Sequence, residues 1–409
     1  MRALHPIING CLIFSLQILL TGSFSGHQTL TSSISDHNPV PIALESYRDP
    51  QGRLISGDSP FEGGQGDVNT TKHIKIGLLI QNETSVSAKN GAELAIINAN
   101  TKGDKGIKFE LIVKSMEGPW GTGSKQAVTM IFDENVVAIL GSHDGRNAHL
   151  VEQVSAKSGV VFLSAWSGDP TLSQAFVPWF FNCVPNDQQQ ADALIEEIYN
   201  KRKIANTVVV SDKSYDSQSA LNSFLKNVAK HGNAEPLQLS YDSTGMDIND
   251  LTKKITNRKT GCAVLFVPPP ASIKLIELIK LEKMNFPVYG TLALLDENLI
   301  PGNDLKEYEK VIFVSSVNLS GKIGISFNDK YKKIYGNIPG AAAAYAFDGM
   351  NILIEAIRHA GTQREKLQKF IADIIYEGVT GTIQFDDKGN RKGTPGFVEI
   401  KNGTPLPVK

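Results

Sequence analysis

Two glycine-bearing loops, each directly after a short apolar run, hold the residues best suited to grip a small molecule. The run 136–140 leads into Gly141 to Asn147, and the run 160–163 leads into Ser164 to Pro170. With a helix between them, both loops would leave the carboxyl ends of neighbouring parallel strands, where open α/β sheets bind ligands. Free backbone N–H groups, a helix N-terminus, one Arg, two Asp and a Trp suit a small polar or anionic ligand rather than catalysis.

Composition limits the classes of function. The chain has 409 residues, of which 41% are hydrophobic, and a formal net charge of -1. It can bury a large core, and its length favours two or more domains. The balance of 41 basic against 42 acidic residues, without a basic stripe, argues against nucleic acid as a partner.

The N-terminal part indicates export. Arg2 is followed by a largely apolar stretch from Cys11 to Leu20, and small residues follow near Ser25. This stretch is short for a membrane span, so residues 1–26 are interpreted as a signal peptide, with a retained anchor as the alternative. Residues 27–71 are rich in Ser, Gly, Pro, Asp and Asn, which predicts a disordered leader.

Two cysteines remain if the signal is removed, Cys183 and Cys262. Export would permit a disulfide between them. Two free, buried thiols are the alternative.

From His73 onward, apolar strand-like runs alternate with amphipathic helical patterns. This alternation predicts an α/β fold with parallel sheets and helices on both faces. The number of units favours two lobes, residues 72–183 plus 317–378 and residues 184–316 plus 379–409. The return to the first lobe is inferred from the long helical patterns after residue 340.

Several short segments, in this order and spacing, resemble the type I periplasmic binding proteins. The closest branch is that of the branched-chain amino-acid and amide receptors of ABC importers. The resemblance covers residues 72–405 and implies two doubly wound, Rossmann-like lobes with a ligand cleft between them. Three hinge crossings are expected, near 182–185, 314–318 and 381–383. The segments that carry the resemblance are residues 74–77, 90–95, 124–128, 138–142, 160–164, 209–215, 340–348 and 381–386.

By this resemblance, the first loop matches the segment that holds the ligand's carboxylate. It contributes Gly145, Arg146 and Asn147. Related receptors often have Ser or Thr where this chain has Gly145, which keeps the N–H donor but lacks the hydroxyl. Arg146 could supply a charge-assisted donor instead, or point into solvent from the start of a helix. Asp144 is expected to cap that helix.

The second loop matches the segment that contacts the ligand's amino group and main chain. It contributes Trp166, Ser167 and Gly168. Trp166 would either wall the pocket or pack into the core. From the second lobe, Tyr215 matches a tyrosine that closes over the ligand, with a solvent-facing position as the alternative.

Three further residues are candidates at the cleft. Phe347 stands where related receptors often have Tyr, although core packing explains it more simply. Glu117 and Trp120 follow a predicted strand and would either touch the ligand or only shape the turn. The stretch 116–125 lacks the residue order of a phosphate-binding loop.

One departure from the pattern concerns the ligand. Amino-acid receptors usually pair the ligand's ammonium with a carboxylate after the strand that here reads Pro287 to Gly290. The residues that follow, Thr291 to Leu295, include no acid, and Asp296 comes late. Because an unpaired ammonium in a closed cleft is costly, an α-amino-acid ligand would require another acid.

The sequence therefore predicts a non-enzymatic, periplasmic or otherwise extracytoplasmic receptor. It would act as a monomer without cofactor or metal and deliver a small polar ligand to the membrane subunits of an ABC importer. A ligand-sensing or envelope-scaffolding ectodomain of the same fold is the alternative. An enzyme is disfavoured, because the chain has no Gly-x-Ser-x-Gly elbow, no Cys/His metal spacing and no dinucleotide fingerprint.

Overall fold

A computed structural model of the chain describes residues 73–102, 107–242, 248–257, 259–283 and 285–408. The predicted signal peptide and leader lie outside the described residues. Within them, apolar strands alternate with helices as the sequence predicts.

The first lobe is built on a sheet with the strand order β2-β1-β3-β4-β5, in which all paired strands are parallel. Alternate residues of β1 face opposite layers, since Ile76 and Leu78 join one buried cluster and Leu79 joins the other. The strands are β1 (His73–Ile80), β2 (Lys108–Ser115), β3 (Ala138–Ser142), β4 (Val161–Ser164) and β5 (Phe180–Asn182).

The second lobe is built on a sheet with the order β14-β13-β10-β9-β8-β6-β7. Its five strands from β10 to β7 pair in parallel, whereas β13 and β14 are antiparallel additions at one edge. The strands are β6 (Thr207–Ser211), β7 (Leu237–Ser240), β8 (Cys262–Leu265), β9 (Val288–Gly290), β10 (Ile312–Val314), β13 (Phe397–Lys401) and β14 (Thr404–Pro407).

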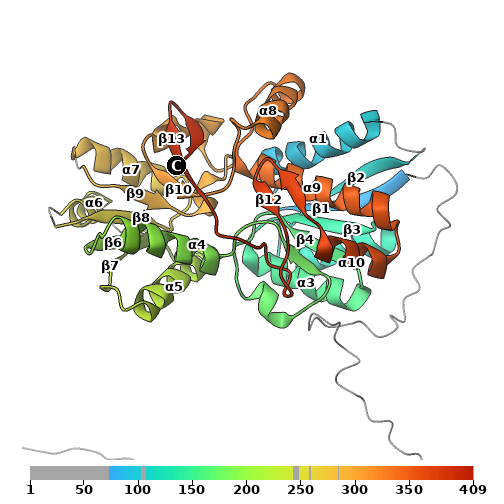
Figure 1. The fold of residues 1–409 in the computed structure, drawn as a ribbon, viewed down its shortest axis with the longest axis horizontal. Coiled ribbons are helices and arrows are strands. Elements are labelled where there is room, and N and C mark those ends of the chain that lie inside the picture. The colour runs from blue at the N-terminus through green and yellow to red at the C-terminus, as the bar shows by residue number, and fades with distance from the viewer. Residues whose placement is uncertain (1–72, 103–106, 243–247, 258, 284, 409) are drawn as a thin grey trace, which may run out of the picture. The chain divides into compact units, whose positions relative to one another are not determined.

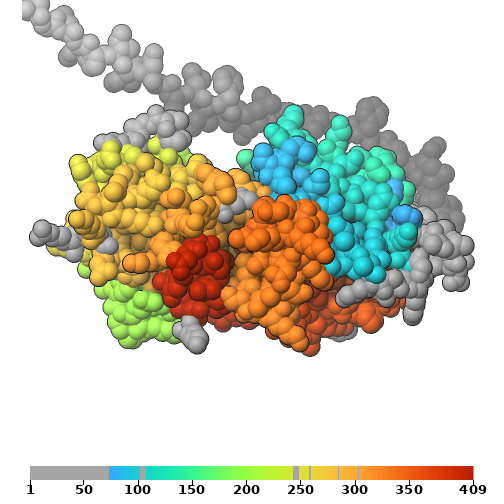
Figure 2. All heavy atoms as spheres, turned by 90° about the horizontal axis from the view of Figure 1, so that it is seen from above, coloured from blue at the N-terminus to red at the C-terminus, as the bar shows by residue number. Residues whose placement is uncertain are grey.

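Helices cover both faces of each sheet, which buries the strands from two sides (Figure 1). The first lobe carries α1 (Val86–Lys102), α2 (Thr122–Val128), α3 (Gly145–Ser158), α9 (Ala341–Ala360) and α10 (Arg364–Asp373). The second lobe carries α4 (Asp187–Ile195), α5 (Tyr215–Lys230), α6 (Ile248–Ile255) and α7 (Ala271–Leu281). A further helix, α8 (Lys322–Tyr335), lies on the surface of the molecule (Figure 2). The Tyr335 hydroxyl at its end donates to Glu93 of α1 in the first lobe.

The chain passes between the lobes in three segments. The first follows β5, the second follows β10, and the third follows the hairpin of β11 (Tyr376–Gly378) and β12 (Gly381–Ile383). Ile383 and Phe385 pack in the core of the first lobe, so the chain reaches the second sheet only after Arg391, later than the expected crossing at 381–383. The exact lobe boundaries stay a prediction.

Two element bounds differ from the sequence interpretation. The sequence pattern predicts a helix over residues 364–376, but α10 ends at Asp373 and Tyr376 begins β11 instead, because its backbone pairs with Ile383. The pattern also predicts a helix over residues 148–157, but α3 begins at Gly145, because the Asp144 side chain accepts a hydrogen bond from the Asn147 amide. The predicted cap at Asp144 is confirmed.

The two cysteines are free and buried, and they belong to different core clusters. A disulfide between Cys183 and Cys262 is therefore excluded in this fold.

Helices α1 and α9 make a close contact through a residue without a side chain. A Cβ atom on Gly91 would collide with the backbone carbonyl of Ala343, in the first turn of α9. That turn matters because it packs with the second lobe, whereas the rest of α9 packs with the first.

We expect Gly91→Ala to lower the free energy of unfolding by about 1–3 kcal/mol, because the backbone of α9 must shift to admit the methyl group. Urea denaturation measures this change, with Lys89→Ala on the exposed side of α1 as the control. Equal midpoints for the two variants would contradict a close helix contact.

Candidate functional site

The loop after β3 places its predicted residues at the start of α3. Asp144 caps the helix, and its second carboxylate oxygen accepts from the Asn147 side chain at 2.7 Å. The Gly145 N–H donates to the carboxylate of Asp216, 3.1 Å away, at the start of α5 in the second lobe. The donor that the sequence assigned to a ligand carboxylate is thus already bonded to a carboxylate of the protein.

The same contact explains why glycine stands at position 145. A Cβ atom there would lie 2.7 Å from the Cβ of Asp169 and 3.1 Å from the Asp216 carboxylate. A serine or threonine would therefore push the loop after β4 and the start of α5 away. The absence of a hydroxyl at this position follows from the close approach of three segments.

Arg146 lies over the ring of Trp120, with its Cζ 4.7 Å from the ring centroid. Both side chains are exposed, and Trp120 is 67% exposed. This cation–π contact joins the loops after β2 and β3 at the surface. Glu117 is exposed in the same loop as Trp120. A ligand role for these three residues remains a prediction.

The loop after β4 is held by its own hydrogen bonds. The Ser167 hydroxyl accepts from the Asp169 amide at 3.3 Å, and Ser167 is only 2% exposed. The Gly168 carbonyl accepts from the Asp187 amide at the start of α4. Trp166 is half-buried, packs against the core of the second lobe and meets Tyr345 edge-to-face at 6.4 Å. Trp166 therefore combines core packing with a position between the lobes.

The start of α5 reaches across to this loop. The Tyr215 hydroxyl donates to the Asp169 carboxylate at 2.8 Å, next to the bond between Gly145 and Asp216. Tyr215 is still 43% exposed, so it lies at the edge of the contact. Two consecutive side chains of the second lobe thus hold both predicted loops of the first lobe.

Asp169 belongs to a charged network that the sequence did not reveal. His149 lies between Asp169, 3.0 Å from its Nε2, and Glu152, 3.5 Å from its Nδ1. Hydrogen bonds to Asp169 and Glu152 raise the pKa of His149 to about 9. Burial would raise the pKa of Asp169, but hydrogen bonds from His149 and Thr171 outweigh it and lower that pKa to about 2. The network is therefore an ion pair near neutral pH.

The environment of Asp216, the second acid of this contact, disfavours its charged form. Burial, with the nearby charge of Asp144, raises the pKa of Asp216 to about 7. Burial likewise raises the pKa of Asp187, which accepts from the Ser219 hydroxyl at 2.8 Å. Acids therefore outnumber bases where α5 meets the first lobe, and His149 is the cation that offsets them.

Phe347 packs against Phe327, with ring centroids 4.7 Å apart, as the core alternative predicted. The next residue, Asp348, is fully buried and accepts from the Val379 amide and from the amide and hydroxyl of Thr380. Asp348 thus fixes the turn between β11 and β12 to α9. The sequence did carry a signal for this role, because Asp348 follows an aromatic residue inside a long apolar helix, where a buried carboxylate needs hydrogen-bond partners.

The expected ammonium-binding acid is absent, and the later acids serve another purpose. Glu297 accepts from the amides of Gly340, Ala342 and Ala343 and so caps α9. Its neighbour Asn298 accepts from the Ser87 amide at the start of α1. Burial and Asp296 raise the pKa of Glu297 to about 7. The loop after β9 thus docks on two helix N-termini of the first lobe.

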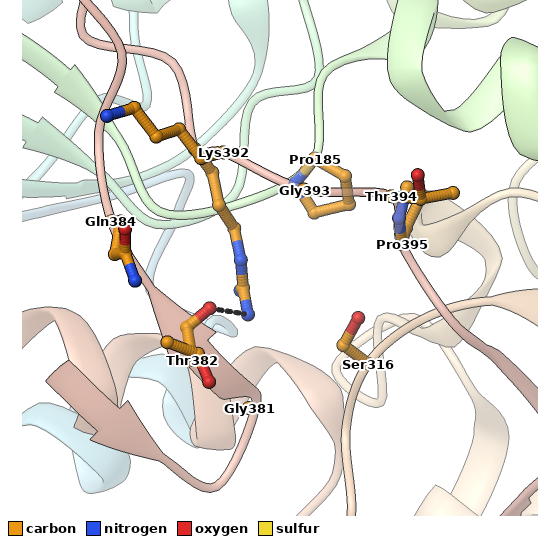
Figure 3. Close-up of a pocket in the computed structure, with 10 residues that line it drawn as sticks. Pro185, Ser316, Gly381, Thr382, Gln384, Lys392, Gly393, Thr394 and Pro395 are labelled. Atoms are coloured by element: carbon orange, nitrogen blue, oxygen red, sulfur yellow. Dashed lines mark hydrogen bonds between the residues drawn. The ribbon is translucent and has the colours of Figure 1, made fainter. Parts of the chain in front are cut away.

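A cavity of about 430 Å³ lies at the three crossings, lined by residues such as Pro185, Ser316 and Arg391 (Figure 3). None of the predicted ligand residues lines it. Among the described residues, no group of three or more His, Cys, Asp or Glu side chains is arranged to hold a metal ion.

Comparison with known families decides the class. Residues 73–403 match the family model described as "Periplasmic binding protein". The chain belongs to the type I periplasmic binding proteins. The family and its fold are those of binding proteins rather than enzymes. Within the described residues, no helix has both the length and the apolar character needed to cross a bilayer.

Solved structures share this fold at low sequence identity. The branched-chain amino-acid binding protein LivJ from Streptococcus pneumoniae, in complex with isoleucine, aligns with a TM-score of 0.70 at 19% identity. The alignment covers 82% of this chain and 99% of that one. A solute-binding protein from R. palustris in complex with benzoate aligns with a TM-score of 0.70 at 16% identity, covering 82% and 96% of the two chains.

One curated relative is a plant receptor rather than a bacterial solute-binding protein. Glutamate receptor 3.4 of Arabidopsis thaliana is 22% identical over 367 residues, which cover 78% of this chain. The chain spans only 38% of the length of that receptor. This chain therefore matches only one part of that longer receptor.

The network around His149 predicts a pH dependence of stability. Since the folded pKa of His149 is raised to about 9, its contribution is complete below pH 6.5 and is lost as the pH rises through 9. We expect the wild type to lose about 2 kcal/mol of unfolding free energy over this window. Asp216, with a raised pKa of about 7, adds a loss at lower pH, between about 4 and 7.

Calorimetric unfolding from pH 6 to pH 9.5 measures the effect. His149→Gln should lack the alkaline part of the loss, whereas the control His231→Gln, outside the network, should retain it. Parallel profiles for wild type and His149→Gln would show that the ion pair does not stabilise the contact.

Proposed function

We propose that this chain is an exported solute-binding receptor that captures a small polar molecule between its two lobes. The observation that carries the proposal is the meeting of Tyr215 and Asp216 with the loops after β3 and β4. Both loops stand at the carboxyl ends of adjacent parallel strands, where α/β sheets bind ligands. Bonds of this kind across a cleft are what lobe closure requires.

The ligand residues of this proposal come from both sides of the contact. Trp166 supplies an aromatic wall, Gly145 a backbone donor, and Tyr215 a lid from the second lobe. Arg146, Asn147, Ser167, Gly168, Phe347, Glu117 and Trp120 remain further candidates, although Asn147 and Ser167 already hold protein partners.

Asp216 restricts the chemistry of the ligand. A carboxylate could bind the Gly145 amide only by displacing Asp216, and it would then face Asp169 as well. An ammonium or hydroxyl group meets no such repulsion and would find an acceptor in Asp216. The oxygens of Asp169 already accept from His149, Thr171 and Tyr215. Asp216 stands in for the carboxylate that is missing after β9, so a ligand bearing an amine or several hydroxyl groups fits best.

The proposed role is delivery of the solute to the membrane subunits of an ABC importer. The receptor would act as a monomer in the periplasm or elsewhere outside the cytoplasm.

Ligand sensing without transport is the second candidate, favoured by the similarity to a plant glutamate receptor. Genes for a permease and an ATPase beside the coding gene would support import. A neighbouring kinase gene would support sensing.

The direct test is thermal unfolding with a panel of isoleucine, leucine, glutamate, benzoate, putrescine and ribose. We expect at least one compound to stabilise the protein, by about 2.7 kcal/mol when its concentration is 100 times its dissociation constant. Amines or polyols should act more strongly than benzoate.

Variants locate the effect. Trp166→Ala should abolish stabilisation by the active compound, whereas Leu281→Ala, which changes an exposed apolar residue on α7, should retain it. A panel without any stabilisation at millimolar concentration, or an effect unchanged in Trp166→Ala, would contradict solute capture between the lobes.

A further inference from the structure

The cavity at the crossings has walls from all three segments that join the lobes. Pro185 comes from the first crossing, Ser316 from the second, and Arg391 and Lys392 from the third, while Thr382 lies in β12 just before the third crossing. Figure 3 shows Pro185, Ser316 and Thr382 on different sides of this space. Its volume of about 430 Å³ lies within the range of small-molecule sites.

Arg391 brings a buried positive charge to the cavity. The residue is 7% exposed, and Nη1 donates to the Cys183 carbonyl and the Thr380 hydroxyl. Nη2 donates to the carbonyls of Thr380 and Thr382. These bonds use four of the five guanidinium N–H groups and leave Nε–H, for which no partner is found in the described part of the chain.

No acid offsets this charge within ion-pair distance among the described residues. The ten residues that line the cavity include Arg391 and Lys392 but no Asp or Glu. Lys392 is exposed, and Figure 3 shows its side chain extended away from Ser316, so it adds charge at the rim. Hydroxyl and amide groups of Ser316, Thr382 and Gln384 complete a lining rich in hydrogen-bond donors.

Two carboxylates, of Asp348 and Glu377, lie close to this lining and reduce the positive electrostatic potential in the cavity. Asp348 lies behind the turn between β11 and β12, where its oxygens accept from Val379 and Thr380. Glu377 accepts from the Thr382 hydroxyl at 2.8 Å and is exposed at the hairpin. Asp348 is engaged by two backbone amides and the Thr380 hydroxyl, whereas Glu377 competes for one hydroxyl of the cavity.

We propose that this hinge cavity binds a small anion carrying a phosphate or carboxylate group. Arg391 supplies the buried charge and the free Nε–H, Lys392 supplies charge at the entrance, and Ser316 and Thr382 supply hydroxyl donors. Because all three crossings form its walls, an anion bound there favours one arrangement of the crossings over others. The cavity shares no lining residue with the proposed solute site at the loops after β3 and β4.

The test titrates the full-length protein with sodium phosphate and sodium citrate in a calorimeter, against sodium chloride at equal ionic strength. We expect at least one of the two anions to bind, and its identity distinguishes a phosphate from a carboxylate source. Lys392→Gln should weaken that binding about threefold. Glu377→Gln should strengthen it, because one negative charge beside the cavity is removed and the Thr382 hydroxyl is held by a weaker, neutral acceptor.

Controls separate this site from the cleft. Lys226→Gln, which removes an exposed lysine on α5, should leave anion binding unchanged, and so should Trp166→Ala. Arg391→Lys should abolish binding, with circular dichroism used to check that this variant folds. The proposal is overturned if neither anion binds at 10 mM, if Lys392→Gln and Glu377→Gln bind like the wild type, or if Trp166→Ala abolishes binding.

Discussion

The hydrogen bond from the Gly145 amide to the Asp216 carboxylate joins the tip of β3 to the start of α5. It requires a residue without a side chain at position 145, since a Cβ atom would meet both Asp169 and Asp216. The second bond across the contact, from Tyr215 to Asp169, depends on the same approach. His149 then holds a positive charge beside Asp169, which offsets part of the repulsion between the gathered acids. Capture of a solute would have to exploit or replace these contacts.

Other contacts near the crossings also use carboxylates and cations that bind backbone groups. Glu297 caps α9 from the second lobe, Asp348 holds the turn between β11 and β12, and Arg391 ties the first crossing to the third. Backbone amides and carbonyls at the crossings lie outside the regular ladders of the sheets, so when they are buried they need other partners, and these side chains supply some of them. The crossings are thereby defined in position, and a cavity with a net positive lining remains between them.

Much of the fold follows from local sequence, and most of the site contacts do not. Alternating strand and helix patterns placed both loops at the carboxyl ends of β3 and β4, and Asp144 was recognisable as a cap. The strand and helix patterns did not predict α4, although its start carries a signal, a capping box of Asn186 and Gln189. Strand β5 has only three residues, too few for a periodic pattern. The partner of Gly145 lies 71 residues away in the chain, and no local pattern encodes that pairing.

Hydrogen exchange at the Gly145 amide in the protein without added ligand tests the central claim most directly. The account predicts that this amide is protected in the wild type. It also predicts that Asp216→Ala accelerates its exchange at least tenfold, with the Ala148 amide inside α3 unchanged. Equal exchange of the Gly145 amide in the two proteins would show that Asp216 does not hold the loop after β3, and the proposed meeting of the lobes at this point would be contradicted.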